Sequence, residues 1–112
     1  MQATTRKRRE DRNHVIYLLT NKESGDTYLG LTVVRGSALV KSAQVRFGQH
    51  VYNAHVRGLN GKLYQNIRQH GKEVFKVDVV AKVRGKEAAH EVETEWIEKI
   101  RPTLNMLKVV RN

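Results

Sequence analysis

Glu93 is the residue whose position in the sequence most strongly suggests chemistry. Residues 87–100 have the spacing of an amphipathic helix, and Glu93 falls near the middle of its apolar stripe, opposite the other glutamates of the segment. An unpaired carboxylate in a protein interior costs on the order of several kcal/mol, so Glu93 requires an arginine or lysine, a metal ion or a water-filled pocket. A structural salt bridge to an arginine explains this position as well as a functional site does. The stripe consists of Ala89, Val92, Trp96, Ile97 and Ile100.

Tyr17 and Tyr28 are a second group of interest, because they lie on neighbouring segments that both alternate like β-strands. Side chains of a strand point alternately to its two faces, so one register of the two segments brings both phenols onto the same face. Gly30 shares that face and has no side chain that could block a ligand. The alternative interpretation is a common hairpin with two half-buried tyrosines and no function.

Arg46 and His50 are four residues apart in a segment with helical periodicity, residues 43–56, so we expect them to share one helix face with Arg57. Gly48 weakens such a helix, which indicates close packing or a close approach of another backbone at this position. A single histidine is more often a surface or core-edge residue than a catalyst. The histidines of the chain show no zinc-binding spacing, and the sequence contains neither a nucleophile elbow nor a Walker loop.

The elements that position these residues begin with a hairpin. Residues 15–20 and 27–32 are its strands, and Gly25 supplies the positive φ that the turn between them needs. After a loop at residues 33–42 comes the helix at residues 43–56.

The second half of the chain continues the pattern with a short helix at residues 61–70, which Asn60 caps and Gly71 ends. Residues 75–83 form a third strand, and the last helix at residues 87–100 precedes Pro102. This order predicts an α+β fold with a small three-stranded, mainly antiparallel sheet flanked by helices. The residues expected on the core face of the third strand are Phe75, Val77, Val79 and Ala81.

The chain has 112 residues, no cysteine and a formal net charge of +10. Its length predicts one domain at residues 14–112, preceded by a flexible basic arm at residues 1–13. The charge favours nucleic acid as the partner, with an anionic membrane surface as the competing interpretation. No apolar run is long enough to span a membrane, so we expect a cytoplasmic protein without disulfides or thiolate metal sites. The cations of the arm include Arg6, Lys7, Arg8 and Arg9.

Several short motifs follow one another along the chain. They are Val15-Ile16-Tyr17, Tyr28-Leu29-Gly30, Arg46-x-x-x-His50, the segment 63–71 followed by Phe75, and the closing segment 93–105 with its Arg101-Pro102 and Asn105. In this order they resemble the GIY-YIG nucleases, and the resemblance covers residues 15–105. Val15 replaces the family's first glycine and Leu29 replaces an isoleucine, but neither change removes a reacting group.

The resemblance implies the GIY-YIG nuclease fold and metal-dependent hydrolysis of phosphodiester bonds in DNA. It implies that Glu93 binds the metal ion, Mg²⁺ or Mn²⁺, which stabilises charge on the phosphate and on the leaving oxygen. Arg46 is then expected to clamp a phosphate oxygen. Tyr17, with His50 helping to take the proton, is expected to orient or deprotonate the attacking water.

Two further residues receive roles from the same resemblance. Tyr28 is expected to position the phosphate or to share the role of Tyr17, and Asn105 is expected to orient the site from outside it. The predicted partner is double-stranded DNA. Besides the arm, the residues predicted to follow its backbone are Arg57, Lys62 and Arg68.

The size of the chain and its middle segment suggest a phage or mobile-element enzyme that acts in the host cytoplasm. A homodimer would supply two active sites for cutting both strands. One alternative is a catalytically silent DNA-binding protein on the same scaffold, and another is a small basic structural or RNA-associated protein. The presence of both tyrosines, the Arg46–His50 pair, Glu93 and Asn105 favours the active enzyme.

Overall fold

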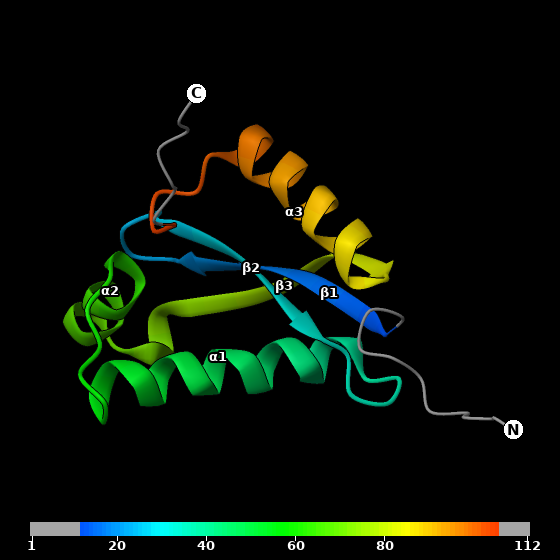
Figure 1. Ribbon diagram of the computed structural model, residues 1–112. Coiled ribbons are helices and arrows are strands. Elements are labelled where there is room, and N and C mark those ends of the chain that lie inside the picture. The colour runs from blue at the N-terminus through cyan, green and yellow to red at the C-terminus, as the bar shows by residue number, and fades with distance from the viewer. Residues whose placement is uncertain (1–11, 106–112) are drawn as a thin grey trace, which may run out of the picture.

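The structure is a computed structural model that describes residues 12–105. Its elements, shown in Figure 1, are β1 (Asn13–Asn21), β2 (Thr27–Val33), α1 (Leu39–His55), α2 (Lys62–His70), the 3₁₀ turn η2 (Lys72–Val74), β3 (Phe75–Arg84) and α3 (Lys86–Ile100). The strands form one antiparallel sheet with the order β2-β1-β3, which confirms the predicted α+β fold. Residues 1–11 of the predicted arm lie outside the described residues, and Asn13 already belongs to β1.

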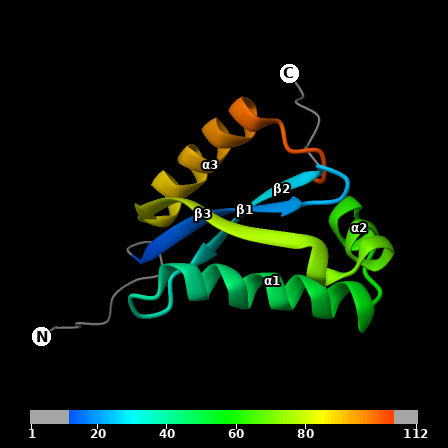
Figure 2. The same ribbon diagram turned by 180° about the vertical axis from the view of Figure 1, so that it is seen from behind.

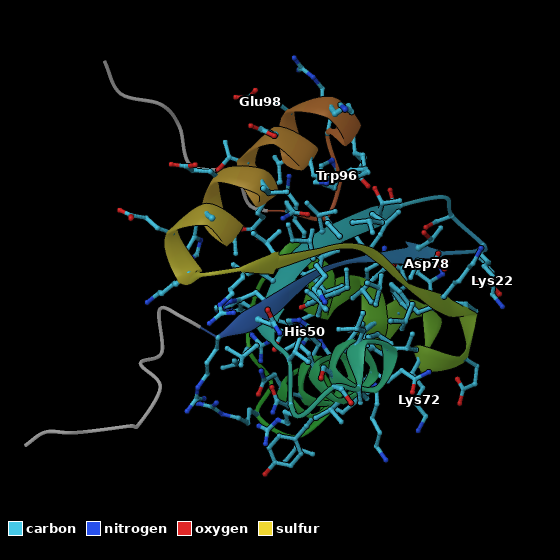
Figure 3. All side chains as sticks on the ribbon, turned by 90° about the vertical axis from the view of Figure 1, so that its right-hand side faces the viewer. Lys22, His50, Lys72, Asp78, Trp96 and Glu98 are labelled. Carbon is cyan, nitrogen blue, oxygen red and sulfur yellow. The ribbon has the colours of Figure 1, made fainter. Side chains whose placement is uncertain are left out.

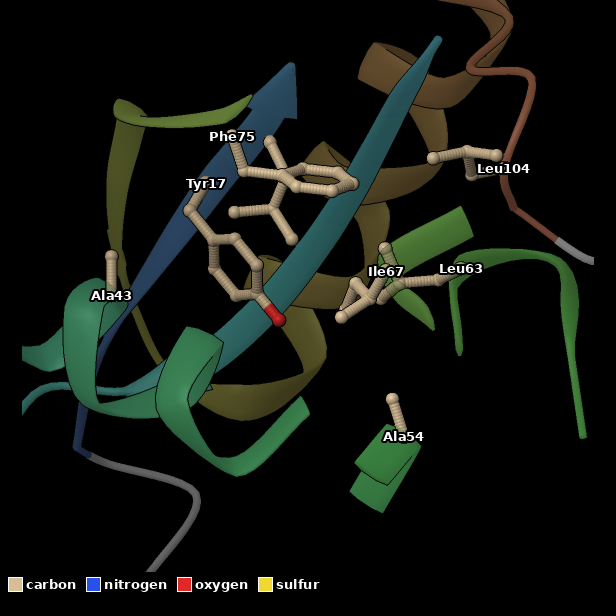
Figure 4. Close-up of a cluster of buried hydrophobic side chains, with 8 residues drawn as sticks. Tyr17, Ala43, Ala54, Leu63, Ile67, Phe75 and Leu104 are labelled. Carbon is tan, nitrogen blue, oxygen red and sulfur yellow. The ribbon is translucent and has the colours of Figure 1, made fainter. Parts of the chain in front are cut away.

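Helices cover both faces of the sheet. Figures 1 and 2 show α1 and α2 on one face and α3 on the other. The main buried cluster joins the sheet to α1 and α2, and Figure 4 shows its side chains converging there. Within residues 12–105, no helix combines the length and the apolar character that crossing a membrane requires. The buried members of the cluster are Tyr17, Leu19, Ala43, Ala54, Leu63, Ile67, Phe75 and Leu104.

The register of the hairpin places both phenols on the α1 side of the sheet, as the alternation predicted. Tyr17 pairs with Gly30, and Leu19 pairs with Tyr28. The ring centroids of the two tyrosines lie 6.3 Å apart. Gly25 adopts φ 80° in the turn, and its N–H donates to the carbonyl of Asn21.

Gly30 was expected to leave space for a ligand, but the structure shows that it accommodates the ring of Tyr17. A Cβ atom built on Gly30 would lie 2.4 Å from both Cζ and Oη of Tyr17. The absent side chain therefore makes room for the ring of Tyr17 and not for a ligand. This packing is possible because directly opposed residues of an antiparallel pair project from the same face.

The start and the exposed face of α1 differ from the prediction. The helix begins at Leu39, four residues before the predicted start. Ser42 lies inside the first turn, where its Oγ donates to the carbonyl of Ala38 and accepts from the N–H of Arg35. Nothing within residues 12–105 lies within 4 Å of a Cβ built on Gly48, so the predicted close packing at this glycine is wrong.

The remaining differences are local. Arg57 follows the end of α1, so the predicted shared helix face with Arg46 does not exist. Gly61, with φ 146°, and not Asn60, is the N-cap of α2. On β3, Val79 pairs with Tyr17 but Ala81 pairs with Ile16, because a bulge shifts the register between them. Ala81 therefore projects from the α3 side of the sheet, and its predicted place beside Phe75, Val77 and Val79 is wrong.

Replacing Gly30 with alanine should destabilise the protein, because the new methyl group overlaps the ring of Tyr17. We expect a loss of about 1–3 kcal/mol in the free energy of unfolding, measured by urea denaturation. Gly48→Ala is the matched control, since its methyl group meets open space on a helix and should raise the same free energy by about 0.5–1 kcal/mol. Equal effects of the two substitutions would contradict the packing described for Tyr17.

Candidate active site

A buried hydrogen bond between β1 and α1 lies at the centre of the site. Tyr17 Oη and His50 Nε2 are 2.8 Å apart, and both side chains are about 1% exposed. Figure 3 shows His50 between α1 and the sheet. The His50 ring also packs edge-on against Tyr28, with centroids 5.3 Å apart, and lies 5.9 Å from the ring of Tyr64 on α2. Three tyrosines from separate elements therefore surround one imidazole.

Burial decides the protonation of this pair. Desolvation raises the pKa of Tyr17 well above its ordinary value, and the negative charge of an ionised Tyr28 would raise it further, although the Arg46 guanidinium opposes both. Desolvation, and then the charge of Arg46, lower the pKa of His50 to about 4. At neutral pH the phenol therefore keeps its proton and the imidazole is neutral. Within the described residues, Nδ1 of His50 has no hydrogen-bond partner.

Arg46 is held by its neighbour on α1. Its Nη1 donates to Oε1 of Gln49 over 2.8 Å, across less than one helical turn. The side chain is only partly buried, and its positive charge favours the ionised forms of Tyr17 and Tyr28. The guanidinium thus borders the same pocket as the tyrosines, and it retains donors for another group.

Glu93 is partly buried on α3, in agreement with its place on the apolar stripe. Its side chain is 20% exposed, whereas Glu91 and Glu95 beside it are exposed to solvent. Within residues 12–105 the one basic side chain within salt-bridge distance of it is that of His90, whose Nδ1 lies 3.6 Å from Oε1. Burial raises the pKa of the Glu93 carboxyl, and His90 opposes that shift. The alternative of a structural salt bridge to an arginine is therefore not observed.

One pocket of about 460 Å³ brings the reactive groups together. Tyr17, Tyr28, Arg46 and Glu93 all border it. The pocket lies beside β2, which is an edge strand. Residues of both α1 and α3 can therefore line it. His50 does not line the pocket but contacts it through Tyr17.

Asn105 acts on the backbone of β2. Its Oδ1 accepts from the N–H of Leu29 over 2.8 Å, and its Nδ2 donates to the carbonyl of Leu29 over 2.9 Å. Two residues earlier on β2, the N–H of Thr27 donates to Thr103 Oγ1 and its carbonyl accepts from the N–H of Leu104. The segment after α3 thereby fixes the outer edge of the strand that carries Tyr28.

The cations predicted to bind DNA lie in different surroundings. Arg57 and Lys62 are exposed, and Lys62 stands at the start of α2. Arg68 donates through Nη1 to the carbonyls of Ala54 and Leu59, so it caps the end of α1. A role for these three residues in DNA binding stays a prediction. The predicted contacts of Arg6, Lys7, Arg8 and Arg9 lie outside the described residues.

Two partners of the site were not recognised from the sequence. Gln49 follows Arg46 by three residues and His90 precedes Glu93 by three, so in each case the helical i, i+3 spacing was the available signal. Residues 12–105 contain no group of three or more His, Cys, Asp or Glu side chains arranged to hold a metal ion. A single hard carboxylate beside an open pocket still fits Mg²⁺, which proteins often hold through one or two carboxylates, water and substrate phosphate.

Comparisons with known proteins identify a family and agree with the fold. The pattern of one family, described as the GIY-YIG catalytic domain, matches residues 13–106. The catalytic domain of the homing endonuclease I-TevI is similar in structure, with 20% identity, a TM-score of 0.66, and coverage of 85% of this chain and 99% of that chain. A glutamate-to-alanine variant of the catalytic domain of the intron endonuclease I-TevI has 18% identity, a TM-score of 0.69, and coverage of 89% and 99%. No curated protein matches the chain.

The depressed pKa of His50 predicts a specific loss of stability in acid. In the unfolded chain His50 binds a proton below about pH 6.5, its ordinary pKa. In the folded protein it binds that proton only below about pH 4. Stability from this group is therefore present above pH 6.5 and is lost as the pH falls towards 4. Between about pH 7 and pH 4.5, urea denaturation should show a loss of about 2 kcal/mol that His50→Gln, which cannot titrate, lacks. The same loss in both proteins would refute the assignment.

Replacing Asn105 with alanine should leave both peptide groups of Leu29 without their partner. We expect the free energy of unfolding to fall by about 1–3 kcal/mol in a thermal or urea titration. Asn60→Ala, in an exposed loop, is the control and should change the value by less than about 0.5 kcal/mol. If the two variants were equally stable, Asn105 would not be anchoring β2.

Proposed function

The chain belongs to the GIY-YIG family, and from that premise we propose that it is a DNA endonuclease that hydrolyses phosphodiester bonds with the help of Mg²⁺ or Mn²⁺. The observation that carries the proposal is the pocket where two phenols, a guanidinium and a carboxylate meet. The similar solved structures are catalytic domains of endonucleases, which supports the same class of reaction. Double-stranded DNA as the substrate is supported by the net charge of +10.

Glu93 is the residue that would hold the metal ion. Its carboxylate is the anionic oxygen donor at the pocket, and the raised pKa caused by burial is the expected state of a carboxyl without a cation. When bound there, a divalent ion would stabilise negative charge on the scissile phosphate and on the leaving 3′-oxygen.

Arg46 would bind a non-bridging oxygen of the same phosphate. A guanidinium suits this role because its planar fork can donate two parallel hydrogen bonds. Gln49 accepts one of its N–H groups and limits its rotation, which leaves the other donors directed to the pocket. Tyr28 on β2 also borders the pocket and packs against His50, and it would help to position the phosphate.

Tyr17 and His50 would manage the proton of the attacking water. Tyr17 Oη accepts that proton while its own passes to Nε2 of His50, 2.8 Å away, and the water oxygen forms its bond to phosphorus as the bond to the 3′-oxygen breaks. The low pKa of His50 keeps Nε2 unprotonated at neutral pH and therefore able to accept. Since burial raises the pKa of Tyr17, the phenol is a relay in this scheme and not a standing phenolate.

The proposal extends to origin and assembly. A phage or mobile-element source is supported by the similar homing and intron endonucleases, and such an enzyme would act in the host cytoplasm. Cutting both strands would require two active sites, which a homodimer supplies.

Replacing Glu93 with alanine should reduce Mg²⁺-dependent nicking of supercoiled plasmid by about 10²-fold or more, because the carboxylate ligand is lost. The fold and most of the affinity for DNA should remain, as measured by thermal unfolding and fluorescence anisotropy. Glu91→Ala removes the same charge from an exposed position on α3 and should cleave like the wild type. Full nicking by Glu93→Ala would defeat the assignment, and a wild type that binds DNA but never cuts it would indicate the silent DNA-binding protein.

A further inference from the structure

The acidic residues of the chain are distributed very unevenly over the two helical layers. Between Asp26 and Glu73 the sequence contains no aspartate or glutamate, and this stretch includes all of α1 and α2. In contrast, α3 carries a row of exposed glutamates. A polyanion is therefore attracted to the α1 side of the sheet and repelled from the outer face of α3. The exposed glutamates of α3 are Glu87, Glu91, Glu95 and Glu98.

A second and larger pocket lies on the attractive side. It has a volume of about 610 Å³, and Arg12, Arg35 and Arg46 all border it. None of its lining residues, all within residues 12–105, is acidic. Figure 1 shows the start of β1 and the loop between β2 and α1 at the same end of the molecule, which explains how Arg12 and Arg35 meet.

This pocket adjoins the candidate active site. Thr32, Val33, Arg46 and Gln49 border both pockets, so Arg46 stands between them. A DNA strand whose scissile phosphate contacts Arg46 would therefore pass directly into the larger pocket.

Both additional arginines stand on backbone that the fold holds in place. The carbonyl of Arg12 accepts from the N–H of Gly85 over 3.0 Å and lies 2.9 Å from Nδ1 of His14. The N–H of Arg35 donates to Ser42 Oγ over 2.9 Å, in a tight turn where Gly36 has φ 61°. The guanidinium groups can thus be extended from fixed points on two sides of one hollow.

We propose that Arg12 and Arg35 form a second phosphate-binding site, which holds the backbone of the cleaved DNA strand on one side of the scissile bond. This inference rests on the proposed endonuclease function, since it takes the strand to be anchored at Arg46. Guanidinium groups bind phosphate oxygens through paired hydrogen bonds, and the absence of acidic neighbours leaves their charge uncompensated. The site selects for a sugar-phosphate backbone and not for a base sequence.

The double substitution Arg12→Ala/Arg35→Ala tests the site. With a fluorescent DNA duplex and a chelator to prevent cleavage, the variant should bind about tenfold more weakly or worse, and the slope of log affinity against log salt should decrease by about 1 to 2. Arg12→Lys/Arg35→Lys should keep most of the slope because it keeps the charges. Thermal unfolding of each variant separates weak binding from loss of the fold.

The matched control is Lys22→Ala/Lys72→Ala, which removes two exposed charges at the other end of the sheet, where Asn21 pairs with Phe75. Figure 3 shows both lysine side chains extending into solvent. This variant should stay within about twofold of the wild-type affinity. If both double variants lost affinity for DNA equally, the proposed site would be refuted, because the loss would then depend on net charge alone.

A second measurement locates the phosphates. Once the wild-type cut is mapped, single phosphates around it are replaced by neutral methylphosphonates. The wild type should lose affinity when phosphates on one side of the cut are replaced, and Arg12→Ala/Arg35→Ala should be insensitive at those positions. If Arg12→Ala/Arg35→Ala lost as much affinity as the wild type at those positions, the inference would be refuted. A wild type that binds DNA without cutting it would refute the endonuclease proposal instead, and the salt titration would still decide the phosphate site.

Discussion

The fit of the Tyr17 ring over Gly30 is the constraint on which the rest of the structure depends. It requires one register of the hairpin, because only the residue opposite Tyr17 can leave the space that the ring fills. From that position the phenol reaches His50, which sets the separation between the sheet and α1. The core and the candidate site are therefore one packing arrangement, and a change in either would move the other.

The same burial controls the electrostatics of the site. Desolvation keeps the proton on Tyr17 and off His50, so the pair is neutral although it lies beside the charged groups Arg46 and Glu93. Arg46 lies on α1 and Glu93 on α3, on opposite faces of the sheet. They border one pocket because β2 is the edge strand of the sheet. An edge strand, which is often a structural weakness, is here the place where the two layers share a pocket.

Much of this could be predicted from the sequence because the signals are local. A period of two gave the shared face of Tyr17 and Tyr28, a helical period singled out Glu93, and both were confirmed by the geometry. The failures depend on contacts between distant segments. The bulge that turns Ala81 away appears only when β3 pairs with β1, and the space over Gly30 is filled by another strand. The family resemblance, and not periodicity, indicated that Arg46 and Asn105 belong with the other site residues.

The hydrogen bonds between the segment after α3 and β2 also limit pairing of this sheet edge with strands of other chains. At Thr27 and at Leu29, both the N–H and the carbonyl that face away from β1 are already occupied, by Thr103, Leu104 and Asn105. Exposed groups of this type recruit strands from other chains and begin aggregates. The three residues Thr103, Leu104 and Asn105 thus block strand addition at Thr27 and Leu29, the first part of this edge.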